Sequence, residues 1–170
     1  KDLPPLVKAL LDPALYPGSP STVELVQTEM SFLFIAGDLV YKVKKPVNLG
    51  YLDYTTLEKR RHFCEQELKL NRRLCPEIYL EVVPVTVDKG DYRFGGSGEV
   101  EEYAVRMKKL PREGMLDYLL ARGEATGEMM ARIAEKLAAF HAKARTSREI
   151  SRYGSLETIS FNTEENFSQT

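Results

Sequence analysis

The sequence has no apolar run approaching the roughly 20 residues that a membrane-spanning helix needs. It opens without a signal-peptide pattern, and it begins with Lys1 rather than Met, so we expect that an upstream segment is missing. Its two cysteines, Cys64 and Cys75, lack metal-site spacing and suit a reducing cytoplasm better than a disulfide framework. The 24 Lys and Arg residues balance 25 Asp and Glu, so no overall field attracts nucleic acid or an anionic membrane. These absences favour a cytoplasmic protein that does not act at a membrane.

What the chain does contain is typical of a globular protein. It has 170 residues, of which 43% are hydrophobic and 29% charged, enough for one compact core or about one and a half domains. No internal repeat or low-complexity tract is found.

The order of the expected elements indicates the fold class. Helical spacing is found at 6–11, 55–74, 115–122 and 128–144, strand patterns at 23–27, 32–35, 39–43, 78–87 and 100–107, and a polar, irregular tail at 146–170. Strands that come before most of the helices are typical of an α+β fold. Pro111 ends the last strand, so a lobe boundary is expected near it.

The strand at 39–43 carries the first candidate site residue. Side chains alternate between faces, so Val40 and Lys42 share the face opposite Leu39, Tyr41 and Val43. An apolar contact beside an anchored positive charge suits a flat base followed by phosphates. The alternative is a solvent-facing lysine on an ordinary strand, with Lys44 and Lys45 nearby as solubility charges.

The helix expected at 55–74 carries the second candidate. On a helical projection Glu67 falls in the middle of a stripe formed by Phe63, Cys64, Leu70 and Leu74. A carboxylate that faces a core needs a cation, and Lys42 on the preceding strand is the natural one. The alternative is that the Glu67 carboxylate is paired with backbone groups or with Arg60 on the same face of the helix.

With these residues in place, the chain resembles the kinase-like fold of aminoglycoside phosphotransferases. It resembles in particular a bacterial branch whose members often carry a P-loop ATPase domain downstream. The matching segments cover nearly the whole chain in order: 34–47, 52–58, 70–74, 105–111 and 137–141. The resemblance implies a protein-kinase-like N-lobe, with an antiparallel sheet of about five strands and one long helix, and then the helices of a truncated C-lobe.

The implied organisation is an N-terminal helical segment at 1–20, a nucleotide-binding lobe at 21–110 and the start of a second lobe at 111–170. The implied cofactors are ATP and Mg²⁺. Lys42 would bind the α- and β-phosphates, and Glu67 would be its helix partner. The other implied contacts are Val40 on the adenine, Met107 behind it, the backbone of Lys108 and Leu110 as the adenine hinge, and Ser31, in a turn that contains no glycine, near the phosphates.

The catalytic half of the family pattern is absent from this sequence. The family supplies its base and metal ligands from a His-Gly-Asp segment with a following Asn and from a later Asp. Neither His62 nor His141 is followed by Gly-Asp. Asp88-Lys89-Gly90 fits a D-x-G string, but it lies in a turn before the hinge, where the family places no metal ligand. We therefore expect no catalytic residue and no metal ligand in this chain, which alone should be inactive.

The main hypothesis is the ATP-binding portion of a small-molecule kinase acting on an unidentified hydroxyl-bearing acceptor, with the base and metal ligands beyond Thr170. The alternative is a non-catalytic, pseudokinase-like module that binds nucleotide or a partner and regulates an attached ATPase. A third hypothesis, nucleic-acid binding through scattered Arg and Lys doublets, is disfavoured by their dispersal in a neutral chain. We also expect uncovered apolar faces on the helices at 115–144, and so either a dimer or cover from another part of the protein.

Overall fold

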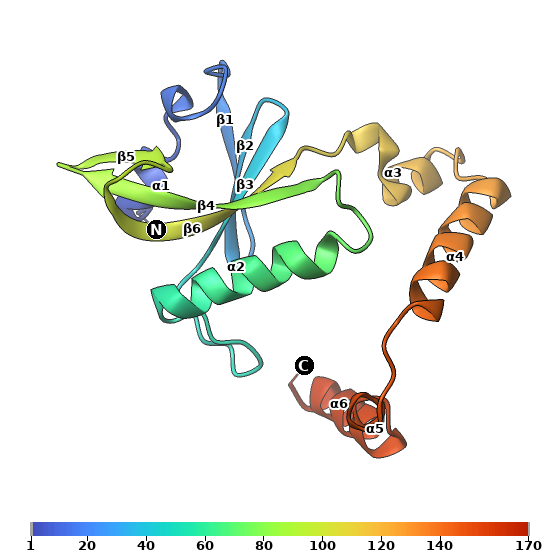
Figure 1. Ribbon diagram of the computed structural model, residues 1–170. Coiled ribbons are helices and arrows are strands. Elements are labelled where there is room, and N and C mark those ends of the chain that lie inside the picture. Colours follow the sequence, from blue (N-terminus) through green and yellow to red (C-terminus); the bar gives the residue numbers. More distant parts are fainter. Residues whose placement is uncertain (1, 170) are drawn as a thin grey trace. The chain divides into compact units, whose positions relative to one another are not determined.

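The computed structural model describes residues 2–169 and has an α+β fold (Figure 1). The helices are α1 (Pro5–Ala9), α2 (Leu57–Asn71), α3 (Leu116–Ala121), α4 (Gly127–Ala142), α5 (Arg148–Arg152) and α6 (Leu156–Gln169), with short 3₁₀ turns η1 (Pro13–Leu15) and η2 (Arg112–Gly114). The strands are β1 (Val23–Gln27), β2 (Ser31–Ala36), β3 (Leu39–Lys44), β4 (Tyr79–Asp88), β5 (Asp91–Phe94) and β6 (Glu99–Lys108). The chain divides into two compact units, one ending at Met115 and the other beginning at Leu116.

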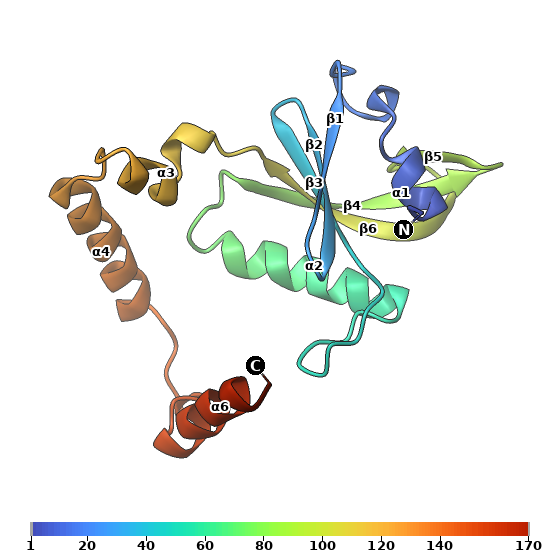
Figure 2. The same cartoon turned by 180° about the vertical axis from the view of Figure 1, so that it is seen from behind.

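The first unit is built on one antiparallel sheet with the strand order β1-β2-β3-β6-β4-β5. Figures 1 and 2 show β1–β3 crossing β4–β6 steeply, so the sheet is strongly curled. The sequence predicted about five strands and missed β5. Lys89 and Gly90 turn the chain with φ values of 51° and 92°, a pair of left-handed residues that closes a tight hairpin. The predicted loop therefore contains a short strand paired with the end of β4.

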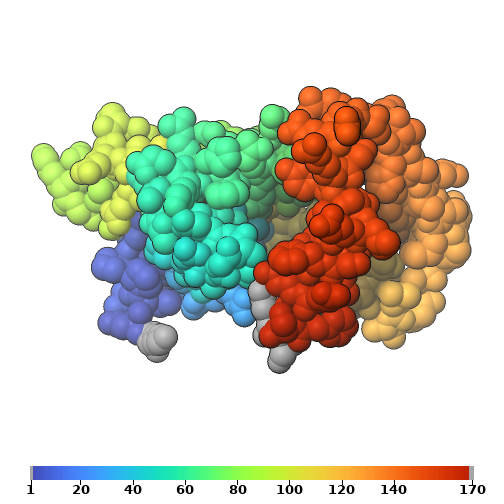
Figure 3. Space-filling view, turned by 90° about the horizontal axis from the view of Figure 1, so that it is seen from below, coloured from blue at the N-terminus to red at the C-terminus, as the bar shows by residue number. Residues whose placement is uncertain are grey.

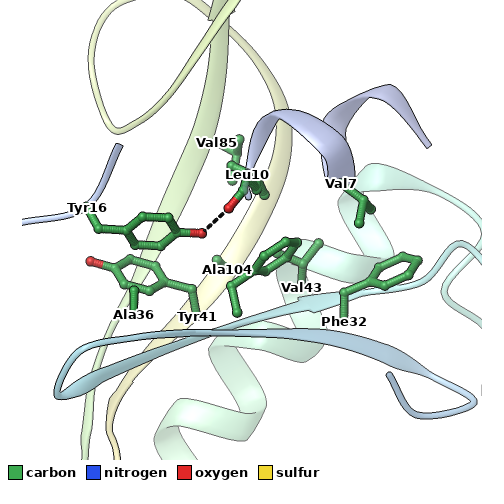
Figure 4. Packing of buried hydrophobic residues seen from close by; sticks show 10 residues of the cluster. Val7, Leu10, Tyr16, Phe32, Ala36, Tyr41, Val43, Val85 and Ala104 are labelled. Carbon is green, nitrogen blue, oxygen red and sulfur yellow. Dashed lines mark hydrogen bonds between the residues drawn. The ribbon is translucent and has the colours of Figure 1, made fainter. Parts of the chain in front are cut away.

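The hydrophobic core of this unit lies on one face of the sheet, beneath α1 and η1 (Figure 4). Tyr41 and Val43 project from β3 into it and are 1% exposed. The Tyr16 ring meets the Tyr41 ring edge-on at 5.0 Å, and its hydroxyl donates a 2.6 Å hydrogen bond to the Leu10 carbonyl. Because side chains alternate along β3, Lys42 and Lys44 face the other side of the sheet.

That other face is turned toward α2. The sequence predicted a cap at Thr55 or Thr56, and the cap is Thr56, whose hydroxyl accepts a hydrogen bond from the Lys59 N–H. Its buried residues are Arg60 and Cys64, spaced by four residues on one stripe. The expected apolar stripe is only partly correct: Cys64 is buried, but Phe63 and Leu70 are 37% and 53% exposed. Figure 3 shows one side of α2 at the surface of this unit.

The second unit contains α3–α6. The prediction of an irregular tail is wrong, because α5 and α6 occupy most of it. The Ser147 hydroxyl accepts from the Ile150 N–H at the start of α5, and the Ser155 hydroxyl accepts from the Thr158 N–H at the start of α6. These hydroxyls satisfy N–H groups that a helix start leaves unpaired. Across residues 2–169, no helix combines the length and apolarity needed to cross a membrane.

Candidate functional site

Two lysines of β3 converge on one carboxylate of α2. The Lys42 ammonium lies 2.9 Å from Glu67 Oε1, and the Lys44 ammonium lies 2.7 Å from Glu67 Oε2. The lysines share a sheet face because they are two residues apart. Glu67 meets them because it continues the Arg60–Cys64 stripe of the helix that packs on β4 and β6. The sequence predicted the contact between Lys42 and Glu67 and did not predict the contact with Lys44.

The three side chains differ in their access to solvent. Lys42 is 28% exposed, Glu67 14% and Lys44 only 4%. Burial alone would raise the pKa of Glu67, but the hydrogen bonds from Lys42 and Lys44 outweigh it and lower that pKa. Burial alone would lower the pKa of Lys44, but the bond to Glu67 and its charge raise it. The contacts therefore favour the charged forms of Glu67 and Lys44, and one carboxylate faces two ammonium groups.

An apolar surface adjoins the exposed lysine. Val40 of β3 is paired directly with Met107 of β6, and Lys42 is paired with Val105. Directly paired residues of an antiparallel sheet point to the same face, so these side chains lie on the Lys42 side of the sheet. Val40 and Val105 are buried and Met107 is half-buried. The predicted base-contact residues, Val40 and Met107, are thus neighbours of each other and of Lys42.

The predicted hinge begins at the last residue of β6. The Lys108 N–H donates to the Ile78 carbonyl at 2.9 Å, and the Lys109 N–H donates to the Asp38 carbonyl at 2.8 Å. These two bonds tie the end of β6 to β4 on one side and to the β2–β3 turn on the other. Within residues 2–169, the Leu110 N–H makes no backbone hydrogen bond. A fixed segment with an available backbone donor suits recognition of a flat heterocycle edge.

Ser31 lies differently from its expected position. It is the first residue of β2 rather than part of a turn, it is 2% exposed, and it pairs with Lys44 across the ladder. Its N–H donates to the Thr28 hydroxyl at 3.0 Å. That N–H is therefore engaged within the protein, and Lys45 contacts the same turn by donating to the Thr28 carbonyl at 2.6 Å.

The alternative partner considered for Glu67 is committed elsewhere. Arg60 donates from Nε to Glu102 Oε2 at 2.6 Å, and its Nη1 donates to the carbonyls of Tyr54 and Thr55. Burial raises the pKa of Glu102 in spite of this pairing. Arg60 thus fastens the start of α2 to β6 and leaves Glu67 to the two lysines.

Lys44 is the site residue that sequence reasoning missed. Its spacing of two from Lys42 placed it on the correct face of β3, and this was the available signal. Instead, Lys44 and Lys45 were interpreted as solubility charges. Lys44 is buried because the segment between β3 and α2 folds over it, and its ammonium lies 4.9 Å from the centre of the Tyr54 ring.

No three His, Cys, Asp or Glu side chains of residues 2–169 are grouped so that they could hold a metal ion. The arrangement instead offers a partly exposed ammonium, a net positive charge, an adjoining apolar strip and a backbone donor. These features suit an anion attached to an apolar heterocycle.

Comparison with known proteins finds similar mycobacterial proteins, each named as an uncharacterized protein. Over 147 residues, 86% of this chain, the sequence is 28% identical to the uncharacterized protein Rv2004c of Mycobacterium tuberculosis (strain ATCC 25618 / H37Rv). It has the same identity and coverage with the uncharacterized protein Mb2027c of Mycobacterium bovis. The aligned segment spans 28% of each relative's length. No protein-family model matches the chain, and no solved structure does.

Proposed function

We propose that the first unit binds ATP and is the nucleotide-binding portion of a small-molecule kinase resembling the aminoglycoside phosphotransferases. The observation that carries this proposal is the Lys42–Glu67 contact at 2.9 Å beside the Val40–Met107 pair. The intact protein would transfer the γ-phosphoryl group of ATP to a hydroxyl-bearing small molecule in the cytoplasm.

Each residue has a separate task in this proposal. The Lys42 ammonium binds phosphate oxygens, and Glu67 holds it in place before the nucleotide arrives, since a flexible lysine binds a phosphate best when its ammonium is already oriented. Val40 and Met107 contact the faces of the base. The Lys108 carbonyl and the Leu110 N–H meet its edge.

The contacts proposed for the nucleotide do not include Mg²⁺ ligands. Mg²⁺ is held by carboxylate and amide oxygens together with phosphates, and the family pattern supplies these from segments that this sequence lacks. We therefore assign the Mg²⁺ ligands, the base that receives the hydroxyl proton and any P-loop ATPase domain to other parts of the intact protein. The length of the relatives, of which this chain covers 28%, leaves room for them.

Thermal unfolding with and without ATP tests the proposal. A ligand at 100 times its Kd stabilises the folded state by about 2.7 kcal/mol. We expect ATP to raise the Tm of the wild-type chain and to have little effect on Lys42→Met. The matched control is Lys59→Met, which also removes a lysine from a single carboxylate partner, Asp53, but away from the proposed site.

Equal ATP-dependent shifts in wild type and Lys42→Met would remove the assignment of Lys42. No shift in wild type would overturn nucleotide binding. ATP binding without phosphoryl transfer by the intact protein would instead support the non-catalytic module that regulates an attached ATPase.

A further inference from the structure

Glu67 is held by two lysines of very different exposure, and this division suggests two roles. We propose that Lys44 is a positioning residue that keeps Glu67 paired, so that Lys42 can move onto the phosphates of a nucleotide. The inference rests on the proposed nucleotide function and assigns a role to a residue outside the predicted site.

Burial separates the two lysines. The Lys44 side chain is 4% exposed and the Lys42 side chain 28%. Tyr54 lies against the Lys44 ammonium, and the Tyr54 N–H is fixed by a 2.8 Å bond to the Val47 carbonyl. Arg60 holds the Tyr54 carbonyl from the other side at 2.9 Å. Lys44 is therefore enclosed by the segment before α2 and cannot reach a ligand without opening it.

Phosphate binding creates a competition for the Lys42 ammonium. If Lys42 were the sole partner of Glu67, each step toward a phosphate would leave a mostly buried carboxylate unpaired, which is strongly unfavourable. The carboxylate would also repel the incoming phosphate. With Lys44 on Oε2, Glu67 keeps a charged partner throughout.

The net charge of Lys42, Lys44 and Glu67 also supports a positioning role for Lys44. One carboxylate and two ammonium groups leave the cluster with a net charge of +1, and removing Lys44 would make it neutral. Lys42 is the more exposed of the two cations, so the excess positive charge is accessible on its side. Lys44 thus acts by compensating the charge of Glu67, which leaves the charge of Lys42 available, and it does so without touching the ligand.

Calorimetric titration of the 170-residue chain with ATP and with AMP tests this role. We expect Lys44→Met to weaken ATP binding about tenfold, the size of one lost charge-assisted hydrogen bond, and to weaken AMP binding less. A general disturbance of the fold would weaken both nucleotides equally. Lys59→Met is the control, because its carboxylate partner, Asp53, lies outside the cluster.

The decisive comparison uses a Glu67→Gln background. Because Lys44 acts through the charge of Glu67, Lys44→Met/Glu67→Gln should bind ATP as Glu67→Gln does. This pair also remains informative if Lys44→Met alone does not fold, since the double variant buries no unpaired carboxylate at position 67.

Three results would overturn the inference. A further loss of ATP affinity in the double variant would mean that Lys44 contacts phosphate directly. Wild-type affinity in a folded Lys44→Met would mean that Lys44 has no role, while the proposed function stands. Absence of ATP binding in wild type would overturn the proposed function and this inference together.

Discussion

Removing the charge of Glu67 should destabilise the first unit far more than removing any exposed carboxylate of the same helix. Breaking a buried ion pair by changing one partner costs about 3–5 kcal/mol. In Glu67→Gln the amide oxygen still accepts a hydrogen bond from Lys44, which returns about 1 kcal/mol. Lys42 is 28% exposed, so water replaces its lost partner and adds at most about 1 kcal/mol. The expected loss is therefore about 2–5 kcal/mol.

Glu65→Gln is the matched control. Glu65 lies on α2 two residues earlier and pairs with Arg61 at 2.9 Å, but both side chains are more than half exposed, so its loss should be below about 1 kcal/mol. Urea unfolding should be followed through the amide resonances of β2 and β3, so that only the first unit is measured. If Glu67→Gln loses no more stability than Glu65→Gln, the paired cluster is not a stabilising feature of the fold.

Three more predictions follow from the buried charges. The lowered pKa of Glu67 gives stability that is present above the ordinary pKa of a glutamate and is lost as pH falls through the lower folded pKa. The stability advantage of wild type over Glu67→Gln should therefore shrink below about pH 4 in urea titrations. A stability advantage independent of pH would contradict this prediction. Arg60→Met should cost about 3–5 kcal/mol by leaving Glu102 buried and unpaired, and Arg60→Met/Glu102→Leu should recover much of this; equal losses would show that the pair is not coupled. Burial raises the pKa of the Cys64 thiol to about 12. Iodoacetamide at about pH 8 should therefore label Cys75 at least about 100-fold faster than Cys64, as measured by peptide mass spectrometry. Equal labelling rates would place Cys64 at the surface.

Local sequence patterns predicted the elements that have strong local signals. The strand-like run Val23–Gln27 predicted β1, and the pair Thr55 and Thr56 indicated the start of α2. β5 was missed because its four residues alternate between polar and aromatic side chains only over a very short run between two turns. Their strand state depends on pairing with the end of β4, which is a tertiary interaction.

The site was only partly accessible from sequence. Glu67 was found because a charged residue in a helical stripe needs a cation. The stripe itself was only partly correct, since Cys64 is buried as predicted and Arg60 is buried beside it, whereas Phe63 and Leu70 are exposed. The burial of Lys44 was not predictable, because a lysine near a strand end is normally solvated and only the covering segment before α2 excludes water from it.

Mapping the contact residues of a bound nucleotide tests the central claim most directly. Amide and methyl spectra of the 170-residue chain should be recorded while a non-hydrolysable ATP analogue is added. We expect the largest shifts at Val40, Lys42, Met107 and the backbone of Lys108 and Leu110. Shifts confined to another surface, such as the open cavity of about 550 Å³ between η1 and β5, or no shifts at all, would contradict a nucleotide site built on the Lys42–Glu67 contact.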